Sequence, residues 1–294
     1  MKDLLNDAAS LNEKNLSDGI VRRDFLKVAL GTGFAAAALP VVAQNVIKTD
    51  TDGLTAGTVM ITVNGQAVPV YRAQPAGKTG LPVVLVISEI FGVHEYIADV
   101  ARRFAKQGYL ALAPDLFVRQ GDATRQPTQA DLMKNIIAKT PDNEVLGDLD
   151  ATVAWAKANG GNTDKLGITG FCWGGRITWL YAAHNPNVKA GVAWYGRVVG
   201  DKTAINPEHP IDLAAKIKAP VLGLYGAKDT GIPVESLDKM KAALAAAGNI
   251  KCTFVVYPNS GHAFHADYRP SYNEADAKDG YARALAWFKA NGVA

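Results

Sequence analysis

Short, continuously apolar runs alternate along the chain with stretches whose apolar residues recur at helical spacing. The run at 81–87 (LPVVLVI) contains no polar residue, which is typical of a strand buried on both faces of a sheet. The same reading predicts strands at 109–113, 166–169, 188–194, 221–225 and 253–257, and helices at 96–106, 144–158, 176–183, 234–247 and 274–290. Strands that alternate with helices predict an α/β fold, with a mainly parallel central sheet flanked by helices.

Two segments depart from this alternation. Strand-like residues 58–63 and 68–71 flank Asn64-Gly65, a strong signal for a hairpin turn. Residues 121–142 are polar and contain prolines, and we expect them to form a surface excursion or a lid over the fold. No internal repeat and no change of composition divides the remainder. The sequence therefore predicts a single domain over residues 45–294.

The first 43 residues have the features of an export signal. Residues 22–27 (RRDFLK) precede a mild apolar run at 28–43 that ends in small residues. The paired arginines resemble a twin-arginine signal, which implies the twin-arginine export machinery as a partner and a periplasmic location. An amphipathic first helix with incidental arginines, or an uncleaved membrane anchor, remains an alternative.

Composition narrows the classes of partner. The 294 residues are 48% hydrophobic, enough for one large core, and carry a formal charge of +3 without basic tracts. Nucleic acid is therefore not indicated, and no metal or other cofactor is expected. The two cysteines, Cys172 and Cys252, would suggest one disulfide in an exported protein. Cys252 starts the strand at 253–257, so we expect the two cysteines on neighbouring strands but toward opposite ends.

The most informative motif is Gly170-Phe171-Cys172-Trp173-Gly174. It follows the strand at 166–169 and precedes a predicted helix, as a Gly-x-nucleophile-x-Gly turn does in an α/β-hydrolase. Glycines on both sides of the apex suit a sharp turn packed closely against the sheet. Taken alone, the motif fits a buried core cysteine equally well.

Two downstream residues favour a nucleophile. A thiol needs a base to be reactive at neutral pH, and that base needs an orienting carboxylate. Asp229 follows the strand at 221–225, and His262 lies in the loop after the strand at 253–257, in the order nucleophile, acid, histidine. Individually, Asp229 fits a turn or helix cap, and His262 fits a surface histidine with His265 as its competitor. Together with Cys172 they predict a catalytic triad.

Five motifs together resemble the dienelactone hydrolase (carboxymethylenebutenolidase) family of the α/β-hydrolase superfamily. The resemblance extends from about residue 55 to the C-terminus and implies that family's fold. Its motifs are 87–92 (ISEIFG), 113–117 (APDLF), 170–175 (GFCWGG), 225–229 (YGAKD) and 261–264 (GHAF).

The resemblance implies roles around the thiol. Glu89 matches a glutamate that lies beside the resting thiol and takes its proton when substrate displaces it. Its alternative is a structural carboxylate that accepts backbone hydrogen bonds. The oxyanion hole of this fold uses the N–H after the nucleophile, here Trp173, and the resemblance adds Ile90 as the second donor.

The resemblance also implies a substrate that carries a carboxylate. Arg119 matches one of the family's carboxylate-binding arginines, although an exposed, solvated arginine would look the same. Ala266 occupies the place of the second, which Arg269 or Arg197 would have to replace. Tyr195, at the end of the strand at 188–194, is expected to line the pocket or to belong to the core.

The leading hypothesis is a hydrolase that cleaves lactones or activated enol esters through an acyl-thioester, with a small molecule as substrate. One alternative is a thiol–disulfide redox protein that uses Cys172 and Cys252. Another is a catalytically inactive binding protein on a hydrolase fold. The sequence sets no expectation of oligomeric state.

Overall fold

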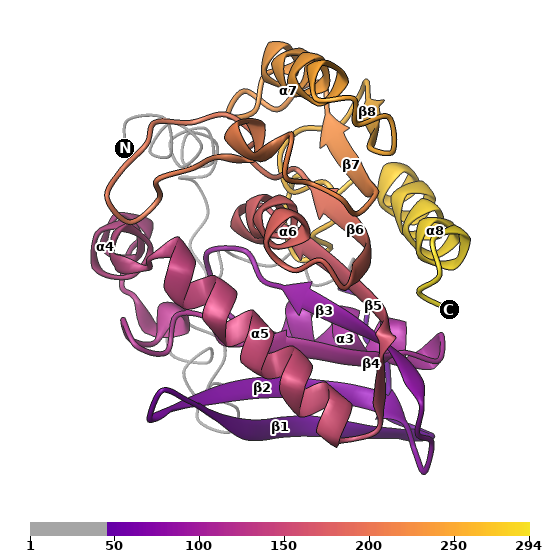
Figure 1. Ribbon diagram of the computed structural model, residues 1–294. Helices are drawn as coiled ribbons and strands as arrows, with labels where there is room; N and C mark the ends of the chain where they lie inside the picture. The colour runs from indigo at the N-terminus through magenta and orange to yellow at the C-terminus, as the bar shows by residue number, and fades with distance from the viewer. Residues whose placement is uncertain (1–45) are drawn as a thin grey trace.

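The computed structural model describes residues 46–294, so the predicted export signal at 1–43 lies outside the described residues. One sheet of eight strands runs through the molecule in the order β1-β2-β4-β3-β5-β6-β7-β8 (Figure 1). The strands are β1 (Leu54–Val63), β2 (Gln66–Pro75), β3 (Leu81–Ile87), β4 (Leu110–Pro114), β5 (Gly161–Phe171), β6 (Val188–Trp194), β7 (Val221–Gly226) and β8 (Thr253–Tyr257).

The strands from β3 to β8 pair in parallel, as the continuous apolar runs predict. The antiparallel pairs of this sheet are β1 with β2 and β2 with β4. Asn64 and Gly65 both have positive φ, 50° and 82°, as a two-residue hairpin turn requires. The α/β-hydrolase fold is thereby confirmed, including the hairpin.

Helices cover both faces of the sheet. They are α3 (Glu95–Lys106), α4 (Gln129–Asn135), α5 (Asp142–Ala158), α6 (Trp173–His184), α7 (Val234–Ala246) and α8 (Glu274–Ala290), with short 3-10 turns η1 (Ala123–Arg125), η2 (Ile137–Lys139) and η3 (Pro210–Leu213). Phe104 of α3 packs on Phe288 of α8, and Tyr181 of α6 donates a hydrogen bond to Asp150 of α5. In Figure 1, α5 and α6 lie in front of the sheet. Within residues 46–294, no helix is long and apolar enough to cross a membrane.

Residues 121–142 fold over one end of the sheet. They contain η1, α4 and η2 and contribute Leu132 and Ile136 to a small apolar cluster with Ile90 and Phe117. Trp173, next to Cys172, packs against the same cluster. This excursion therefore adjoins the segments that flank the predicted nucleophile.

The parallel strands bring the predicted functional residues to one edge. Glu89 follows β3, Cys172 follows β5, Tyr195 follows β6, Asp229 follows β7 and His262 follows β8. All five lie just beyond the carboxyl ends of parallel strands, where open α/β sheets place their binding sites.

Candidate active site

Cys172 occupies a strained turn between β5 and α6. Its φ and ψ are 54° and −114°, a backbone conformation that costs a non-glycine residue about 1–3 kcal/mol. A Cβ at Gly170 would clash with the carbonyl oxygen of Gly174, and one at Gly174 would lie 2.5 Å from that of Ser88. Glycine at both positions therefore allows the turn to be this tight, and Cys172 itself remains partly exposed.

Asp229 and His262 form a hydrogen-bonded pair. His262 Nδ1 lies 2.7 Å from Asp229 Oδ2, and the side chains are 22% and 2% exposed. Asp229 Oδ1 accepts hydrogen bonds from the backbone N–H groups of Gly231 and Ile232, at 3.0 and 3.1 Å. The carboxylate is thus fixed by its own loop and in turn orients the imidazole.

The two histidines of this loop have opposite proton affinities. Burial by itself lowers the pKa of His262, but interactions with the side chains of Cys172 and Asp229 outweigh it and raise the pKa well above its usual range. Burial, followed by the charge of Arg103, holds the pKa of His265 well below its usual range. His265 Nδ1 lies 2.6 Å from the hydroxyl of Tyr96. The surroundings therefore favour His262 over His265 as the base.

The two predicted oxyanion-hole donors lie on segments that touch. Trp173 begins α6, and the N–H groups of a helix's first turn have no acceptor within the helix. Gly174 packs against the backbone of Ser88, which brings the segment carrying Ile90 to the start of α6. Their use by an oxyanion stays a prediction.

Glu89 is fully buried, and its contacts differ from those that the resemblance implies. Its Oε2 accepts a 2.6 Å hydrogen bond from the Tyr268 hydroxyl and lies 3.6 Å from His94 Nε2, while its Oε1 lies 3.9 Å from Arg269 Nη1. Burial raises the pKa of Glu89, but His94, Arg269 and Tyr268 together lower it below its usual value. Within residues 46–294, no hydrogen bond joins Glu89 to Cys172.

Sequence reasoning missed His94 and Tyr268 entirely. The available signal was position alone: His94 closely follows Glu89 in the loop after a buried strand, and Tyr268 lies in the loop that carries His262. Nothing in the periodicity shows that these two loops meet.

Arg119 is paired with α5. Its guanidinium donates to both carboxylate oxygens of Asp148, at 2.5 and 2.8 Å, and lies 3.7 Å from Glu144. A further donor reaches the carbonyl of Val63, at the end of β1. The positive charge of Arg119 is therefore balanced by acids of the same molecule.

Arg269 and Arg197 have guanidinium N–H groups that meet no hydrogen-bond acceptor among residues 46–294. The Arg269 side chain is 8% exposed, lies beside the rings of Phe91 and Tyr268, and makes no hydrogen bond within the described chain. Nη2 of Arg197 is buried and has no hydrogen-bond partner among residues 46–294. Ala266, at the place of the family's second arginine, is fully buried.

Tyr195 lies beside the His262–Asp229 pair. It is fully buried, and its ring centre is 5.1 Å from that of His262. Its backbone φ is 37°. The hydroxyl is buried and has no hydrogen-bond partner within residues 46–294. A buried hydroxyl in that state costs about 1–3 kcal/mol, so a ligand that accepted its hydrogen bond would recover that energy.

The alternative of a Cys172–Cys252 disulfide is wrong. Both cysteines are free, and they lie at opposite ends of strands β5 and β8, which are not neighbours but are separated by β6 and β7. Three strand spacings amount to roughly 14 Å. A disulfide needs Cα atoms within about 7 Å of each other. Among the described residues, no group of His, Cys, Asp and Glu is arranged to hold a metal ion.

Comparison with known proteins identifies the family. The Dienelactone hydrolase family profile matches residues 68–292. A Methylorubrum extorquens protein, provisionally named carboxymethylenebutenolidase, is 57% identical over 93% of this chain and 94% of its own. A Bradyrhizobium protein, provisionally named 2-oxo-3-(5-oxofuran-2-ylidene)propanoate lactonase, is 30% identical over 79% of this chain and 92% of its own.

A crystal structure from Klebsiella pneumoniae, provisionally named dienelactone hydrolase, superimposes with a TM-score of 0.79. It is 53% identical in sequence and covers 80% of this chain and 98% of its own. The family match at residues 68–292 spans the strand ends that carry the site. This chain is therefore a hydrolase and belongs to the dienelactone hydrolase family.

Proposed function

We propose that the chain hydrolyses lactones or activated esters of small molecules with Cys172 as the nucleophile. The observation that carries the proposal is the 2.7 Å contact between His262 and Asp229, in the loops after β8 and β7, at the same edge of the sheet as the strained Cys172 turn. A raised pKa of His262 supports an imidazolium that pairs with a thiolate. This is the protonation state in which a cysteine attacks a carbonyl carbon.

The reaction is then a two-step acyl transfer. The Cys172 sulfur bonds to the carbonyl carbon, and the N–H groups of Trp173 and Ile90 stabilise the resulting oxyanion. Collapse breaks the bond to the leaving oxygen, which takes a proton from the His262 imidazolium. The neutral His262 then removes a proton from water, whose oxygen bonds to the thioester carbonyl carbon. Collapse breaks the carbon–sulfur bond, releases the carboxylic acid and leaves the Cys172 sulfur as a thiolate beside the protonated His262.

An enol ester or enol lactone suits a sulfur nucleophile. Its leaving group is a stabilised enolate, which departs from the tetrahedral intermediate without full protonation. A sulfur nucleophile is less basic than an alkoxide and is sufficient when the leaving group is this good.

A turnover comparison tests the nucleophile. We expect Cys172→Ala to abolish hydrolysis of enol lactones and aryl esters, and Cys172→Ser to retain only a small residual rate. Cys252→Ala is the matched control, because this second cysteine lies at the far end of the sheet, and it should keep the wild-type rate. Wild-type turnover by Cys172→Ala would disprove the mechanism.

We further propose that the substrate carries a carboxylate and that Arg269 receives it, with Arg197 and the hydroxyl of Tyr195 as additional donors. The absence of a side-chain hydrogen bond from Arg269 and of a partner for Arg197 Nη2 among residues 46–294 supports this, whereas Arg119 is paired with Asp148. The substrate in the name of the Bradyrhizobium relative is an enol lactone with a carboxylate. By this proposal Arg119 positions α5 rather than the substrate.

A carboxylated substrate and its methyl ester distinguish the roles of Arg269 and Arg119. We expect Arg269→Ala to raise KM for a carboxylated enol lactone by about tenfold or more, as loss of a charged hydrogen bond does, and to change little for its methyl ester. Arg119→Ala should affect both substrates alike. An Arg119→Ala loss confined to the carboxylated lactone would return the role to Arg119.

We also propose that the protein is exported to the periplasm by the twin-arginine route. Residues 22–27 (RRDFLK) and the small, apolar residues that follow them support this. The test is fractionation of cells that express the full chain or its Arg22→Lys, Arg23→Lys variant. Export of the wild type with cytoplasmic retention of the variant is the expected result, and equal distribution would contradict it.

A further inference from the structure

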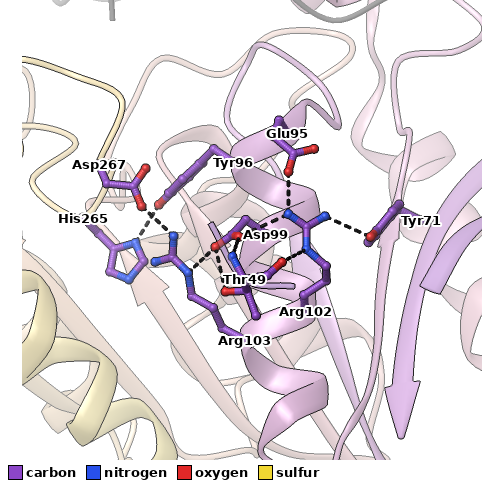
Figure 2. A network of polar contacts seen from close by, with 9 residues as sticks. All are labelled: Thr49, Tyr71, Glu95, Tyr96, Asp99, Arg102, Arg103, His265 and Asp267. Atoms are coloured by element: carbon purple, nitrogen blue, oxygen red, sulfur yellow. Dashed lines mark hydrogen bonds and ion pairs between the residues drawn. The ribbon is translucent and has the colours of Figure 1, made fainter. Parts of the chain in front are cut away.

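Two networks of polar side chains lie next to loops at the site edge of the sheet. One lies between α3 and the loop that carries His262, where Arg103 pairs with Asp267 at 2.5 Å (Figure 2). The other is built around Arg176, in the first turn of α6. The side chain of Arg176 is 7% exposed, and its backbone N–H donates to the carbonyl of Cys172. The function proposed above does not use this second network.

Arg176 uses all of its guanidinium nitrogens. Nη1 and Nη2 donate to the two carboxylate oxygens of Asp142 at 2.6 and 2.7 Å, and Nη2 also donates to the carbonyl of Glu208 at 2.8 Å. Nε lies 3.3 Å from Nδ1 of His209. Asp142 begins α5, and Glu208 and His209 end the loop that follows β6. Arg176 therefore joins three segments that are far apart in the sequence.

This loop, residues 195–209, is called the β6 loop below, and both of its ends rest on Arg176. At its start, a Cβ at Gly196 would lie 2.5 Å from Arg176 N, so the two backbones are in contact. At its end, the guanidinium holds the last two residues. The β6 loop carries Arg197, one of the proposed donors to a substrate carboxylate.

Asp142 extends the same contact to the middle of the β6 loop. Its backbone N–H donates to the carbonyl of Ile205 at 2.9 Å, and its Oδ1 accepts from Asn206 Nδ2 at 3.0 Å. The side chain of Asp142 is 10% exposed, so its charge is buried together with that of Arg176. Breaking such a pair is costly because it leaves a buried charge without a partner.

His209 has to be neutral for its contact with Arg176. A guanidinium only donates hydrogen bonds, so Nδ1 of His209 accepts from Nε of Arg176. Nε2 lies 2.9 Å from the carbonyl of Asp201, which only accepts, so Nε2 carries the proton. A second proton, on Nδ1, would face a cation and break the bond. His265 differs, because its Nδ1 contacts the Tyr96 hydroxyl, which donates as well as accepts (Figure 2).

The charges around His209 act in both directions. The titratable and charged groups around it are Arg176 on α6, Asp142 on α5, Asp201, Lys202 and Glu208 in the β6 loop, and Asp212 on η3. Burial lowers the pKa of His209 and the charge of Arg176 adds to this, while the Asp201 carbonyl and the carboxylates on α5 and η3 act in the opposite direction. The resulting pKa lies below its usual value. In an open loop the pKa is about 6.5, so the closed loop is fully favoured above about pH 6.5 and less favoured as the pH falls below it.

We propose that Arg176 is a positioning residue: with Asp142 and the neutral His209 it holds the β6 loop, and with it Arg197, against the first turn of α6. The consequence for Arg197 rests on the proposed function. The closed loop keeps the Arg197 guanidinium at the site edge of the sheet, where a substrate carboxylate would meet it. When His209 takes a proton from solvent, the end of the loop is released, and only hydrogen bonds are broken.

The test is hydrogen–deuterium exchange of the β6 loop in the full chain between about pH 5 and pH 8, with rates corrected for the intrinsic pH dependence of amide exchange. Arg176→Lys keeps a charge for Asp142 but lacks the Nε donor and the planar fork. His209→Asn supplies an acceptor oxygen that does not titrate. His184→Asn is the matched control, because His184 is an exposed histidine at the end of α6 that pairs with Asp150.

We expect the wild-type β6 loop to be protected at about pH 8 and to lose protection by up to about tenfold for each pH unit below about 6.5. His209→Asn should give the same protection at both ends of the pH range, and His184→Asn should follow the wild type. Arg176→Lys should already show reduced protection at about pH 8, because the loop end is not held at any pH.

Steady-state kinetics test the consequence for the substrate. Arg176→Lys should raise KM severalfold for a carboxylated enol lactone and change it little for the methyl ester. Arg197→Ala should have the same selectivity, and adding Arg176→Lys to it should raise KM no further, because the two residues act through one contact. An equal rise of KM for both substrates would contradict the link between Arg176 and Arg197.

Two exchange results would overturn the inference. One is a β6 loop in Arg176→Lys that is as protected as the wild type at about pH 8. The other is a pH dependence of exchange in His209→Asn that is identical to the wild type. Both are measured without substrate, so they are distinct from failure of the proposed function, which Cys172→Ala would reveal by keeping its activity.

Discussion

At the scale of single residues, the surroundings of a side chain determine its pKa and its pairing more than its residue type does. His262 and His265 lie three positions apart on one loop, yet the pKa of the first is raised and that of the second is lowered. The difference arises because His262 meets Asp229 and the sulfur, whereas His265 is enclosed by Tyr96 and aromatic rings. The same reasoning applies to Arg119, which donates hydrogen bonds to Asp148, and to Arg269, which lies 3.9 Å from Glu89 but whose side chain makes no hydrogen bond within residues 46–294.

Asp229→Asn tests the orienting carboxylate. The amide keeps an oxygen for the N–H groups of Gly231 and Ile232, but removes the charge that helps to raise the pKa of His262. We expect kcat to fall by about 10²–10⁴-fold while the fold is retained. The measurement is steady-state hydrolysis of an aryl ester.

Asp238→Asn is the matched control, because Asp238 is an exposed residue of α7 whose one ion pair among residues 46–294 is with Lys241. It should keep the wild-type kcat. If Asp229→Asn kept it too, His262 would not depend on its carboxylate.

At the scale of elements, the start of α6 explains the geometry of the site. The sequence predicts a helix from residue 176, but α6 begins at Trp173, directly after the nucleophile. Gly174 and Gly175 look like turn residues in the sequence. In the structure both belong to α6. Because they have no side chain, α6 approaches the backbones of Ser88 and Trp194 more closely than a residue with a Cβ would allow.

Gly174→Ala should therefore disturb both the fold and the reaction. Its Cβ would lie 2.5 Å from Ser88 O and would push the Ile90 segment away from α6. We expect a loss of about 1–3 kcal/mol in the free energy of unfolding and a reduced kcat. Urea denaturation and ester hydrolysis measure the two effects.

Gly147→Ala in α5 is the control, since nothing lies within 4 Å of a Cβ built there. Alanine should stabilise that helix by about 0.5–1 kcal/mol and leave kcat unchanged. Equal behaviour of the two variants would mean that the close approach of α6 has no role.

The strands and most helix bounds were predictable because they depend on local periodicity. Helix α4 was missed, although Thr128 caps it by accepting a hydrogen bond from Asp131 N, and the Thr-x-x-Asp spacing is a signal for such a cap. The contact of Glu89 with Tyr268 spans 179 positions and the Arg119–Asp148 pair spans 29. Such pairs depend on how loops and helices pack, which no local pattern records.

At the scale of the whole molecule, stability depends on pH through carboxyl groups that folding buries. Burial raises the pKa of Asp115 to about 6, and the charges of Asp122 and Asp148 add to this, while the N–H of Phe117 acts in the opposite direction. The unfolded value is about 3.9. The folded state therefore binds this proton more tightly, and the contribution to stability is fully present below about pH 4 and lost as the pH rises through about 6.

Asp115→Asn should remove this dependence. The amide can still accept from Phe117 N but carries no charge, so at about pH 8 the variant should exceed the wild type by about 1–3 kcal/mol in the free energy of unfolding. Near pH 4 the two should be about equal. Urea denaturation at the two pH values measures the difference, and a gap that did not change with pH would exclude Asp115 as its source.

The most direct test of the central claim is to identify the acylated residue. The enzyme is mixed with an aryl ester, quenched in acid during steady turnover, digested and analysed by mass spectrometry. The account predicts an acyl group on the peptide that contains Cys172, labile to hydroxylamine and absent from the Cys252 peptide and from Cys172→Ala. An acyl group on any other residue, or none at all while Cys172→Ala turns over at the wild-type rate, would contradict it.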